Sequence, residues 1–233
     1  MEIGREIFWN VGGGARWLTY ALMVITLIVL YVGLKKRYSM WKFAKGKCAP
    51  FDFSKRLWER IGYFIENGIF HKSIMRESFP GTMHFFIFWG FLILAIGTAL
   101  VAFQDDIVRP FFKANILQGG FYLIFSAVLD AAGLVAIIGI VMAIWRRYVT
   151  KPSRLDNKTD DAITLVCILV VLISGFLVEG ARIASTRPDF EVWSFVGWIT
   201  SYLFLGLSPD GIKITHKFFW YLHMLISFGL IAY

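Results

Sequence analysis

Long apolar runs constrain this chain more than any other feature of its sequence. Of the 233 residues, 58% are hydrophobic and the mean hydropathy is +0.64, whereas apolar residues make up roughly 45–50% of soluble domains. A helix that crosses a bilayer needs roughly 20 consecutive apolar residues. Five segments approach that length, namely 17–34, 79–103, 121–145, 162–181 and 213–233. The sequence therefore predicts an all-α membrane protein with a bundle of five transmembrane helices.

Basic residues are unevenly distributed among the segments that join these runs. Residues 35–78 contain eleven Lys and Arg against four acids, and the loop 146–161 contains five more Lys and Arg. Because Lys and Arg in short loops favour the cytoplasmic side, both segments are predicted to be cytoplasmic. The N-terminus is then outside and the C-terminus inside. The net charge of +8 is thus interpreted as a topology signal and not as a sign of nucleic-acid binding.

Two shorter segments have the pattern of helices at the membrane surface. In 52–78, apolar residues recur at helical spacing between charged ones, which predicts an amphipathic helix in the inner interface. Pro80 and Gly81 then start or kink the second span. The run 192–207 would reach about 24 Å as a helix, short of a bilayer core of roughly 30 Å. It is predicted to lie on the outer face, with a sixth span as the alternative.

The chain is interpreted as a single membrane domain over residues 1–233. Its last residues, HMLISFGLIAY, end at Tyr233 without the polar anchor that usually finishes a membrane helix. We therefore expect the fifth span and a cytoplasmic region to continue beyond this point. The two cysteines, Cys48 and Cys167, lie far apart and outside any CxxC or CxxCH motif. An iron–sulfur cluster or a covalent c-type haem held by this chain alone is therefore excluded.

Histidines mark the candidate functional site. His84 lies in the second span, His216 and His223 lie in the fifth, and His71 ends the amphipathic segment. An unmet polar group in hydrocarbon costs several kcal/mol or so, so histidines in spans are functional candidates. His216 and His223 share one helix face, because seven residues are close to two turns. Asp130, in the third span, is expected to pair with a neighbouring helix.

The spacing of the histidines distinguishes two kinds of metal site. Zinc needs three or four nitrogen, sulfur or carboxylate ligands close together, and the chain has no HExxH motif and no cysteine cluster. Two imidazoles on facing helices, surrounded by aromatic residues, instead suit the axial positions of a b-type haem. For each position, a histidine that only hydrogen-bonds a neighbouring helix is the alternative.

The segments PGTMHFFIFWGF in the second span and THKFFWYLHMLISF in the fifth resemble the cytochrome b module of the nitrate reductase gamma subunit superfamily. The most similar branch contains heterodisulfide reductase membrane subunits and electron-transfer-flavoprotein:menaquinone oxidoreductases. This resemblance implies one or two b haems between the second and fifth spans. It implies that His84 and His223 bind one haem iron, and that His71 binds a cytoplasm-side haem whose other ligand lies beyond Tyr233. An alternative register makes His84 the cytoplasm-side ligand and leaves Leu94 where another histidine would stand.

Other polar residues are candidates for two further roles. Glu179 and Arg182 lie three residues apart on one helix face. Together with His216, a further cofactor-binding candidate, they are interpreted as a quinone headgroup site near the outer face, where a carboxylate exchanges a proton. A local ion pair is the alternative. Lys72 and Arg76 are candidates for contacts with haem propionates.

These features favour the membrane part of a quinone-linked oxidoreductase. The resemblance implies electron transfer between a cytoplasmic iron–sulfur or flavoprotein partner, such as electron-transfer flavoprotein, and menaquinone in a bacterial or archaeal cytoplasmic membrane. Iron–sulfur clusters are expected only in that partner or in a region beyond Tyr233. A haem-free membrane anchor that docks a soluble redox complex is the alternative function. A small transporter is disfavoured, because the sequence has no internal repeat and no pair of broken helices.

Overall fold

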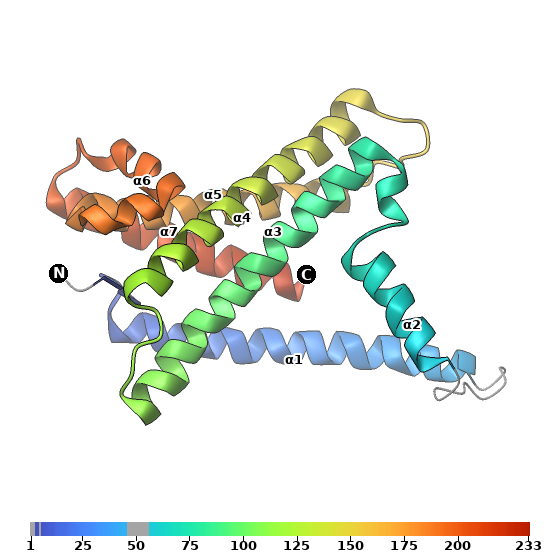
Figure 1. The fold of residues 1–233 in the computed structure, drawn as a ribbon, viewed down its shortest axis with the longest axis horizontal. Coiled ribbons are helices and arrows are strands. Elements are labelled where there is room, and N and C mark those ends of the chain that lie inside the picture. Colours follow the sequence, from blue (N-terminus) through green and yellow to red (C-terminus); the bar gives the residue numbers. More distant parts are fainter. Residues whose placement is uncertain (1–2, 5, 46–55) are drawn as a thin grey trace.

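The structure is a computed structural model that describes residues 3–4, 6–45 and 56–233, and 83% of these described residues are helical. Within the described residues, the only extended pairing is an isolated bridge between Gly4 and Gln118. The predicted all-α class is confirmed. Five long helices correspond to the five apolar runs, namely α1 (Gly12–Lys45), α3 (Ser78–Phe103), α4 (Gly119–Ile144), α5 (Thr159–Thr186) and α7 (Pro209–Ala232), as Figure 1 shows.

Four helical stretches in the described part of the chain are long and apolar enough to cross a membrane. They are Gly12–Phe43, Ser78–Phe112, Gly119–Thr150 and Thr159–Thr186. Helix α7 has 24 residues and is therefore about 36 Å long at 1.5 Å per residue. Its first half contains Lys213, His216 and Lys217, which make it less apolar than the other four. A fifth crossing by α7 therefore stays a prediction.

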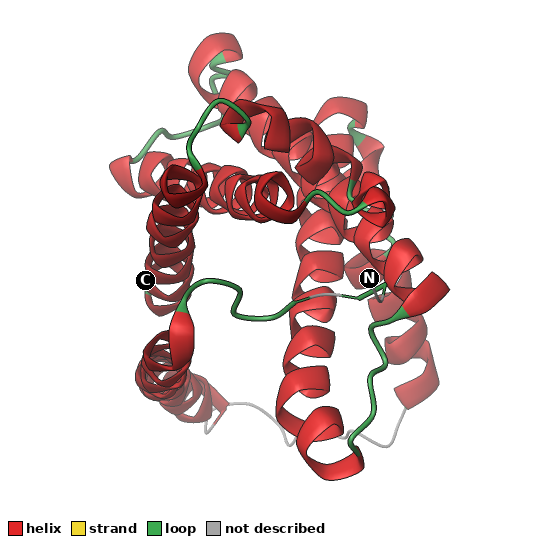
Figure 2. Ribbon diagram, turned by 90° about the vertical axis from the view of Figure 1, so that its left-hand side faces the viewer, coloured by secondary structure: helices red, strands yellow, loops and turns green. Residues whose placement is uncertain are grey.

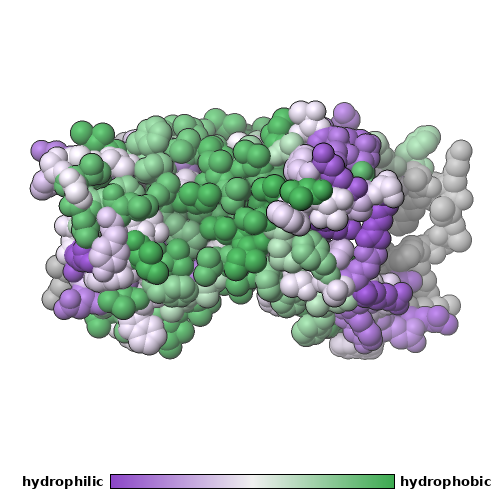
Figure 3. All heavy atoms as spheres, turned by 90° about the horizontal axis from the view of Figure 1, so that it is seen from above, coloured by the Kyte–Doolittle hydropathy of each residue, from purple (hydrophilic) through white to green (hydrophobic). Residues whose placement is uncertain are grey.

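Apolar side chains cover the middle of the molecule. Figure 3 shows a broad apolar band between two more polar ends. On α1, the side chains of Ile25, Leu27 and Ile28 are each more than half exposed. Exposed apolar patches of this extent are rare on soluble proteins, and a lipid environment accounts for them. The chain is a multi-pass membrane protein.

The long helices pack mainly in two pairs. Helix α3 packs along α4, and α5 packs along α7, while α1 lies against α7. Small residues allow the close approach of α3 and α4: a Cβ on Gly90 would lie 2.7 Å from the Cβ of Ala136. Helices α4 and α5 join the two pairs through a core of Ala136, Ile140 and Leu172. The second and fifth predicted spans, α3 and α7, therefore belong to different pairs.

Short helices occupy the segments that were predicted to lie at the membrane surface. The amphipathic segment forms α2 (Leu57–Phe64), the π-helix η1 (Ile65–Ile69) and the 3-10 turn η2 (Ile74–Arg76); residues 52–55 of that prediction lie outside the described residues. The run 192–207 falls on η5 (Asp189–Trp193), α6 (Phe195–Ser201) and η6 (Tyr202–Phe204). The apolar helical stretch here, Phe195–Phe204, is too short to span a bilayer. A short helix here agrees with the predicted one, and its position on the outer face stays a prediction.

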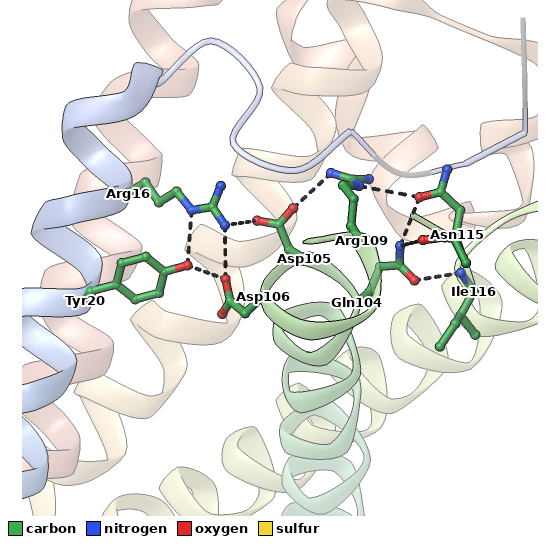
Figure 4. A network of polar contacts seen from close by, with 9 residues as sticks. Arg16, Tyr20, Gln104, Asp105, Asp106, Arg109, Asn115 and Ile116 are labelled. Carbon is green, nitrogen blue, oxygen red and sulfur yellow. Dashed lines mark hydrogen bonds and ion pairs between the residues drawn. The ribbon is translucent and has the colours of Figure 1, made fainter. Parts of the chain in front are cut away.

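A polar network ties α1 to η3 (Gln104–Phe112), the π-helical extension of α3 (Figure 4). Nη2 of Arg16 lies 3.0 Å from Oδ2 of Asp105 and 3.1 Å from Oδ1 of Asp106. Tyr20 donates its hydroxyl to Asp106, and Arg109 binds the other oxygen of Asp105 at 2.9 Å. These contacts fix the start of α1 to the far end of α3. Figure 2 shows the helical bundle turned by 90° from the view of Figure 1.

Candidate functional site

Two of the predicted site histidines meet at the N-terminal end of α3. The ring centroids of His71 and His84 are 4.8 Å apart, and their planes are inclined by 54°. His71 is only 2% exposed, and its Nδ1 lies 2.8 Å from the carbonyl oxygen of Ile69. The Nδ1 atom of His84 is buried, and it has no hydrogen-bond partner in the described structure. Phe88 packs edge-on against His71 at 4.5 Å.

A left-handed turn brings His71 back onto α3. His71 has a φ of 56°, and its carbonyl oxygen accepts hydrogen bonds from the N–H groups of Ile74 and Met75, both at 2.9 Å. Gly81, in the first turn of α3, leaves space for this turn, since a Cβ there would lie 2.7 Å from Cα of Met75. Because the clash would be with backbone, a larger residue at position 81 would push the turn and His71 away from His84.

His223 lies on the face of α7 that packs on α5. Its Nδ1 is 3.0 Å from the carbonyl oxygen of Val171 and 3.1 Å from Oγ of Ser174. Because a carbonyl oxygen can only accept, this contact places the proton on Nδ1 and leaves Nε2 as the basic nitrogen. A Cβ on Gly175 would lie 3.3 Å from Cε1 of the ring, so glycine gives the imidazole its space. Metal-binding histidines are commonly oriented by such a hydrogen bond from the second ring nitrogen.

His216 is buried two turns before His223. It is 2% exposed, and its ring packs edge-on against Trp9, with centroids 4.6 Å apart. Its Nδ1 has no hydrogen-bond partner among the residues that the structure describes. Arg182 lies close enough for its charge to act on this imidazole. The structure therefore brings His216 and Arg182, two members of the predicted quinone site, into one region.

Arg182 is held by Glu191, which sequence reasoning missed. Nη1 of Arg182 lies 2.6 Å from Oε1 of Glu191, and Nη2 lies 3.8 Å from Oε1 of Glu179. Tyr122 donates its hydroxyl to Oε1 of Glu191 at 3.0 Å, and Ser194 donates to Oε2 at 3.1 Å. Burial raises the pKa of Glu191, but the hydrogen bond and the charge of Arg182 outweigh it and keep this pKa below its ordinary value. The sequence offered one indication of this role: Glu191 is an acidic residue directly before the apolar run 192–207.

Two carboxyl groups converge on Gly197 in α6. Oδ2 of Asp130 accepts hydrogen bonds from the N–H groups of Val196 at 2.6 Å and Gly197 at 3.2 Å. A Cβ on Gly197 would lie 2.8 Å from Oε2 of Glu179, so the Glu179 carboxyl fills the space that glycine leaves. Asp130 is 2% exposed, whereas the Glu179 side chain is 20% exposed. Asp130 thus pairs with another helix, as expected, and that helix is the short α6.

Lys72 and Arg76, the two residues proposed to contact haem propionates, both have exposed side chains. Nζ of Lys72 lies 2.7 Å from Oε2 of Glu66, and both side chains are largely exposed. Arg76 is exposed at the end of η2. Lys72 is therefore engaged by a local carboxylate. A contact of either residue with a haem propionate stays a prediction.

The long apolar helices define a multi-pass membrane protein, and a comparison with known families identifies its class. Residues 107–233, more than half of the chain, match the family of the nitrate reductase gamma subunit. The chain belongs to this family. The resemblance inferred from the second and fifth spans is confirmed.

Two curated relatives extend this comparison. The EtfAB:quinone oxidoreductase of Syntrophomonas wolfei is 33% identical over 246 aligned positions, which cover all of this chain and 33% of the relative. A probable iron–sulfur-binding oxidoreductase, FadF, of Bacillus subtilis is 20% identical over 221 positions, which cover 94% of this chain and 30% of the relative. The chain thus spans one third or less of the length of each. No solved structure matches the chain.

Proposed function

We propose that this chain is the membrane cytochrome b module of a quinone-linked oxidoreductase. It carries electrons between a cytoplasmic iron–sulfur or flavoprotein partner and menaquinone, through one or two b haems. Membership of the nitrate reductase gamma subunit family supports this role. So do the names of the relatives, a quinone oxidoreductase and an iron–sulfur-binding oxidoreductase.

The proposed topology has five crossings, with the N-terminus outside. The two basic segments then share the cytoplasmic side. Arg154, in the loop after α4, forms an ion pair with Glu77, just before α3. This contact between the two segments supports placing them at the same end of the bundle. Helix α7 is the fifth crossing in this proposal, because it packs along α5 and is long enough to span the apolar band.

The environment of His223 is the observation that carries the haem proposal. Its Nδ1 is anchored on the carbonyl oxygen of Val171, so Nε2 is the nitrogen that would bind a haem iron. His84 would supply the second ligand, since its Nδ1 is buried and has no hydrogen-bond partner among the described residues. A bound b haem supplies a one-electron redox centre between protein partner and quinone. The chain's own residues position that centre and exclude water from it.

His71 and His84 cannot be the two axial ligands of one iron in the described arrangement. Two nitrogen–metal bonds of about 2 Å in line place the ring centroids about 6 Å apart, but these two centroids are 4.8 Å apart. A second ligand for His84 must therefore come from another element, and His223 on α7 is the proposed one. The adjacency of the two rings also supports the alternative register, in which His84 lies towards the cytoplasmic side.

The proposed quinone site lies near the outer ends of α5 and α7. Reduction of a quinone to a quinol takes two electrons and two protons, so the site needs groups that exchange protons. Asp130 and Glu179 converge on Gly197, while Arg182 is already bound to Glu191. The backbone of α6 already holds the Asp130 carboxyl, so the more exposed Glu179 is the carboxyl group proposed to exchange a proton with the quinone.

A reduced-minus-oxidised spectrum of the purified full-length protein tests the electron-transfer role. The proposal predicts the bands of low-spin b haem and their reoxidation by a menaquinone analogue. A protein without these bands would be the haem-free anchor that the sequence left as the alternative. The quinone site is tested separately, in variants with unchanged haem content.

For the quinone site, Glu179→Gln and His216→Ala are expected to slow quinone reduction at least tenfold. Removal of a general acid or base commonly costs about 10²-fold or more. Asp189→Asn removes an exposed acid of the neighbouring η5 and is the matched control, for which no change is expected. Unchanged rates in both site variants would move the quinone elsewhere.

A further inference from the structure

A cavity of about 260 Å³ opens at the end of the bundle where α3 begins and α4 ends. Apolar side chains from two helices contribute to its lining, namely Met83 and Ile87 from α3 and Leu165 from α5. Arg146 and Arg147, in the π-helix η4 (Trp145–Thr150) that extends α4, also line it. The cavity thus combines an apolar wall with two guanidinium groups. Neither the histidines nor the residues proposed for the quinone site contribute to it.

The charges around this cavity are paired except at one position. Arg147 binds Oδ2 of Asp161 at 2.5 Å, and Arg154 forms its ion pair with Glu77. Arg146 is half-buried and its charge acts on the nearby Glu77 carboxylate, but it forms no hydrogen bond and no ion pair with any residue in the described ranges. Arginines are seldom buried without a partner. A half-buried guanidinium at a cavity mouth therefore calls for an anion.

The level of the cavity relative to the membrane–water interface indicates which kind of anion it binds. Trp145 and Tyr148, on either side of the arginine pair, are 57% and 36% exposed. Exposed Trp and Tyr at the end of an apolar helix are typical of the membrane–water interface. Phospholipid phosphates lie at this level, with acyl chains on the apolar side. Basic pockets between membrane helices on the cytoplasmic side are suited to anionic headgroups.

We propose that this cavity binds the phosphate of an anionic phospholipid, with Arg146 as the main anion ligand. The volume is smaller than the roughly 300–1,000 Å³ of sites that enclose a drug-sized ligand, so it accommodates a headgroup and the first part of one chain. Met83, Ile87 and Leu165 contact that chain. The remaining acyl carbons lie against the outer apolar surface of the bundle. This proposal rests on the membrane placement of the chain and not on its haems.

Native mass spectrometry of the purified full-length protein tests this site. Phosphatidylglycerol and phosphatidylcholine with identical acyl chains are titrated, and inorganic phosphate is added in a separate arm. The wild type is expected to prefer phosphatidylglycerol. Arg146→Gln should weaken that binding about tenfold, since a hydrogen bond to a charged group contributes about 1.4 kcal/mol or more. Arg37→Gln, which removes the same charge from an exposed position on α1, should leave it unchanged.

Several results would overturn the proposal. Equal loss in Arg146→Gln and Arg37→Gln would mean that the preference comes from general basic charge. Equal binding of the two lipids would show that the headgroup charge is not recognised. Competition by inorganic phosphate at concentrations near those of the lipid would assign the cavity to a soluble anion. Arg146→Lys, which keeps the charge, should retain part of the preference, and thermal unfolding and the haem spectrum of each variant verify that it is folded.

Discussion

The buried ion pair between Arg182 and Glu191 leads to a prediction whose size and sign both follow from the structure. Arg182→Met would leave the fully buried Glu191 carboxylate with only two neutral donors, Tyr122 and Ser194. Loss of one partner of a buried pair costs about 3–5 kcal/mol. Protonation of Glu191 limits this cost to about 4 kcal/mol at pH 7, given an ordinary glutamate pKa of about 4.3. We therefore expect the free energy of unfolding to fall by about 3–4 kcal/mol.

The stability of the two proteins should depend differently on pH: between pH 7 and pH 5 the contribution of Glu191 is constant in the wild type, whereas in the variant the stability changes. In the wild type the pKa of Glu191 is lowered, so its contribution to stability is complete above the unfolded-state pKa and is lost as pH falls through the folded-state pKa. In Arg182→Met, burial without a cation raises this pKa. The variant should therefore gain stability as pH falls from neutral towards the ordinary glutamate range.

Unfolding in mixed micelles with increasing SDS, followed by circular dichroism between pH 7 and pH 5, measures both effects. The double variant Arg182→Met/Glu191→Gln is the control, and it should recover about 2 kcal/mol because no buried charge remains. The reasoning would be refuted by a loss below about 1 kcal/mol in Arg182→Met. It would equally be refuted by a stability that falls with decreasing pH in that variant, or by no recovery in the double variant.

Three further predictions concern contacts around the proposed sites. Gly197→Ala would place a Cβ within 2.8 Å of the Glu179 carboxyl and should slow quinone reduction at least tenfold at constant haem content. Gly206→Ala, which has open space around it, is the control and should not slow the reaction. Equal rates in the two variants would contradict the shared role of Asp130 and Glu179. Ser174→Ala removes a hydrogen-bond partner of His223 worth about 1 kcal/mol and should shift one haem midpoint potential by up to about 40 mV in a redox titration. Ser126→Ala in α4, whose hydroxyl bonds only its own helix, is the control, and identical shifts in both variants would argue against His223 as a ligand. Arg16→Gln should lower the free energy of unfolding by about 1 kcal/mol, because the Arg16 side chain is 39% exposed and its ion pairs are partly screened by water. The variant should also speed hydrogen exchange at the start of α1. Unchanged exchange there would mean that the network does not hold α1.

The helices could be predicted from sequence because hydrophobic length alone specifies them. Helix α3 begins and ends within a residue of the predicted second span, and α4 begins and ends close to the third. The fifth span is the least certain of the five from composition, because Lys213, His216 and Lys217 interrupt its apolar character. Its packing on α5 and α1 is a tertiary property. No periodicity in the sequence reveals which helices become neighbours.

The site was only partly predictable, for similar physical reasons. Glu179 and Arg182 could be paired because i and i+3 positions share a helix face. The approach of His71 to His84 depends on a left-handed backbone conformation at His71 itself. β-Carbon sterics disfavour this conformation, and the enrichment of histidine in it is too weak to place such a turn from sequence. Glu191 lies in the short helix η5, which folds back onto Arg182, and such tertiary contacts leave no local pattern. The anchoring of His223 by a backbone carbonyl likewise cannot be inferred from side-chain identity.

The most direct test of the proposed function is the haem content of histidine variants of the full-length protein, measured by the reduced-minus-oxidised spectrum and the haem-to-protein ratio. His223→Ala and His84→Ala should each lose at least one b haem signal, because an open axial position removes a bond that fixes the macrocycle. His216→Ala, on the same face of α7, should keep the haem and lose quinone reactivity. Full haem content in both His223→Ala and His84→Ala would contradict the assignment of these two residues as the axial pair.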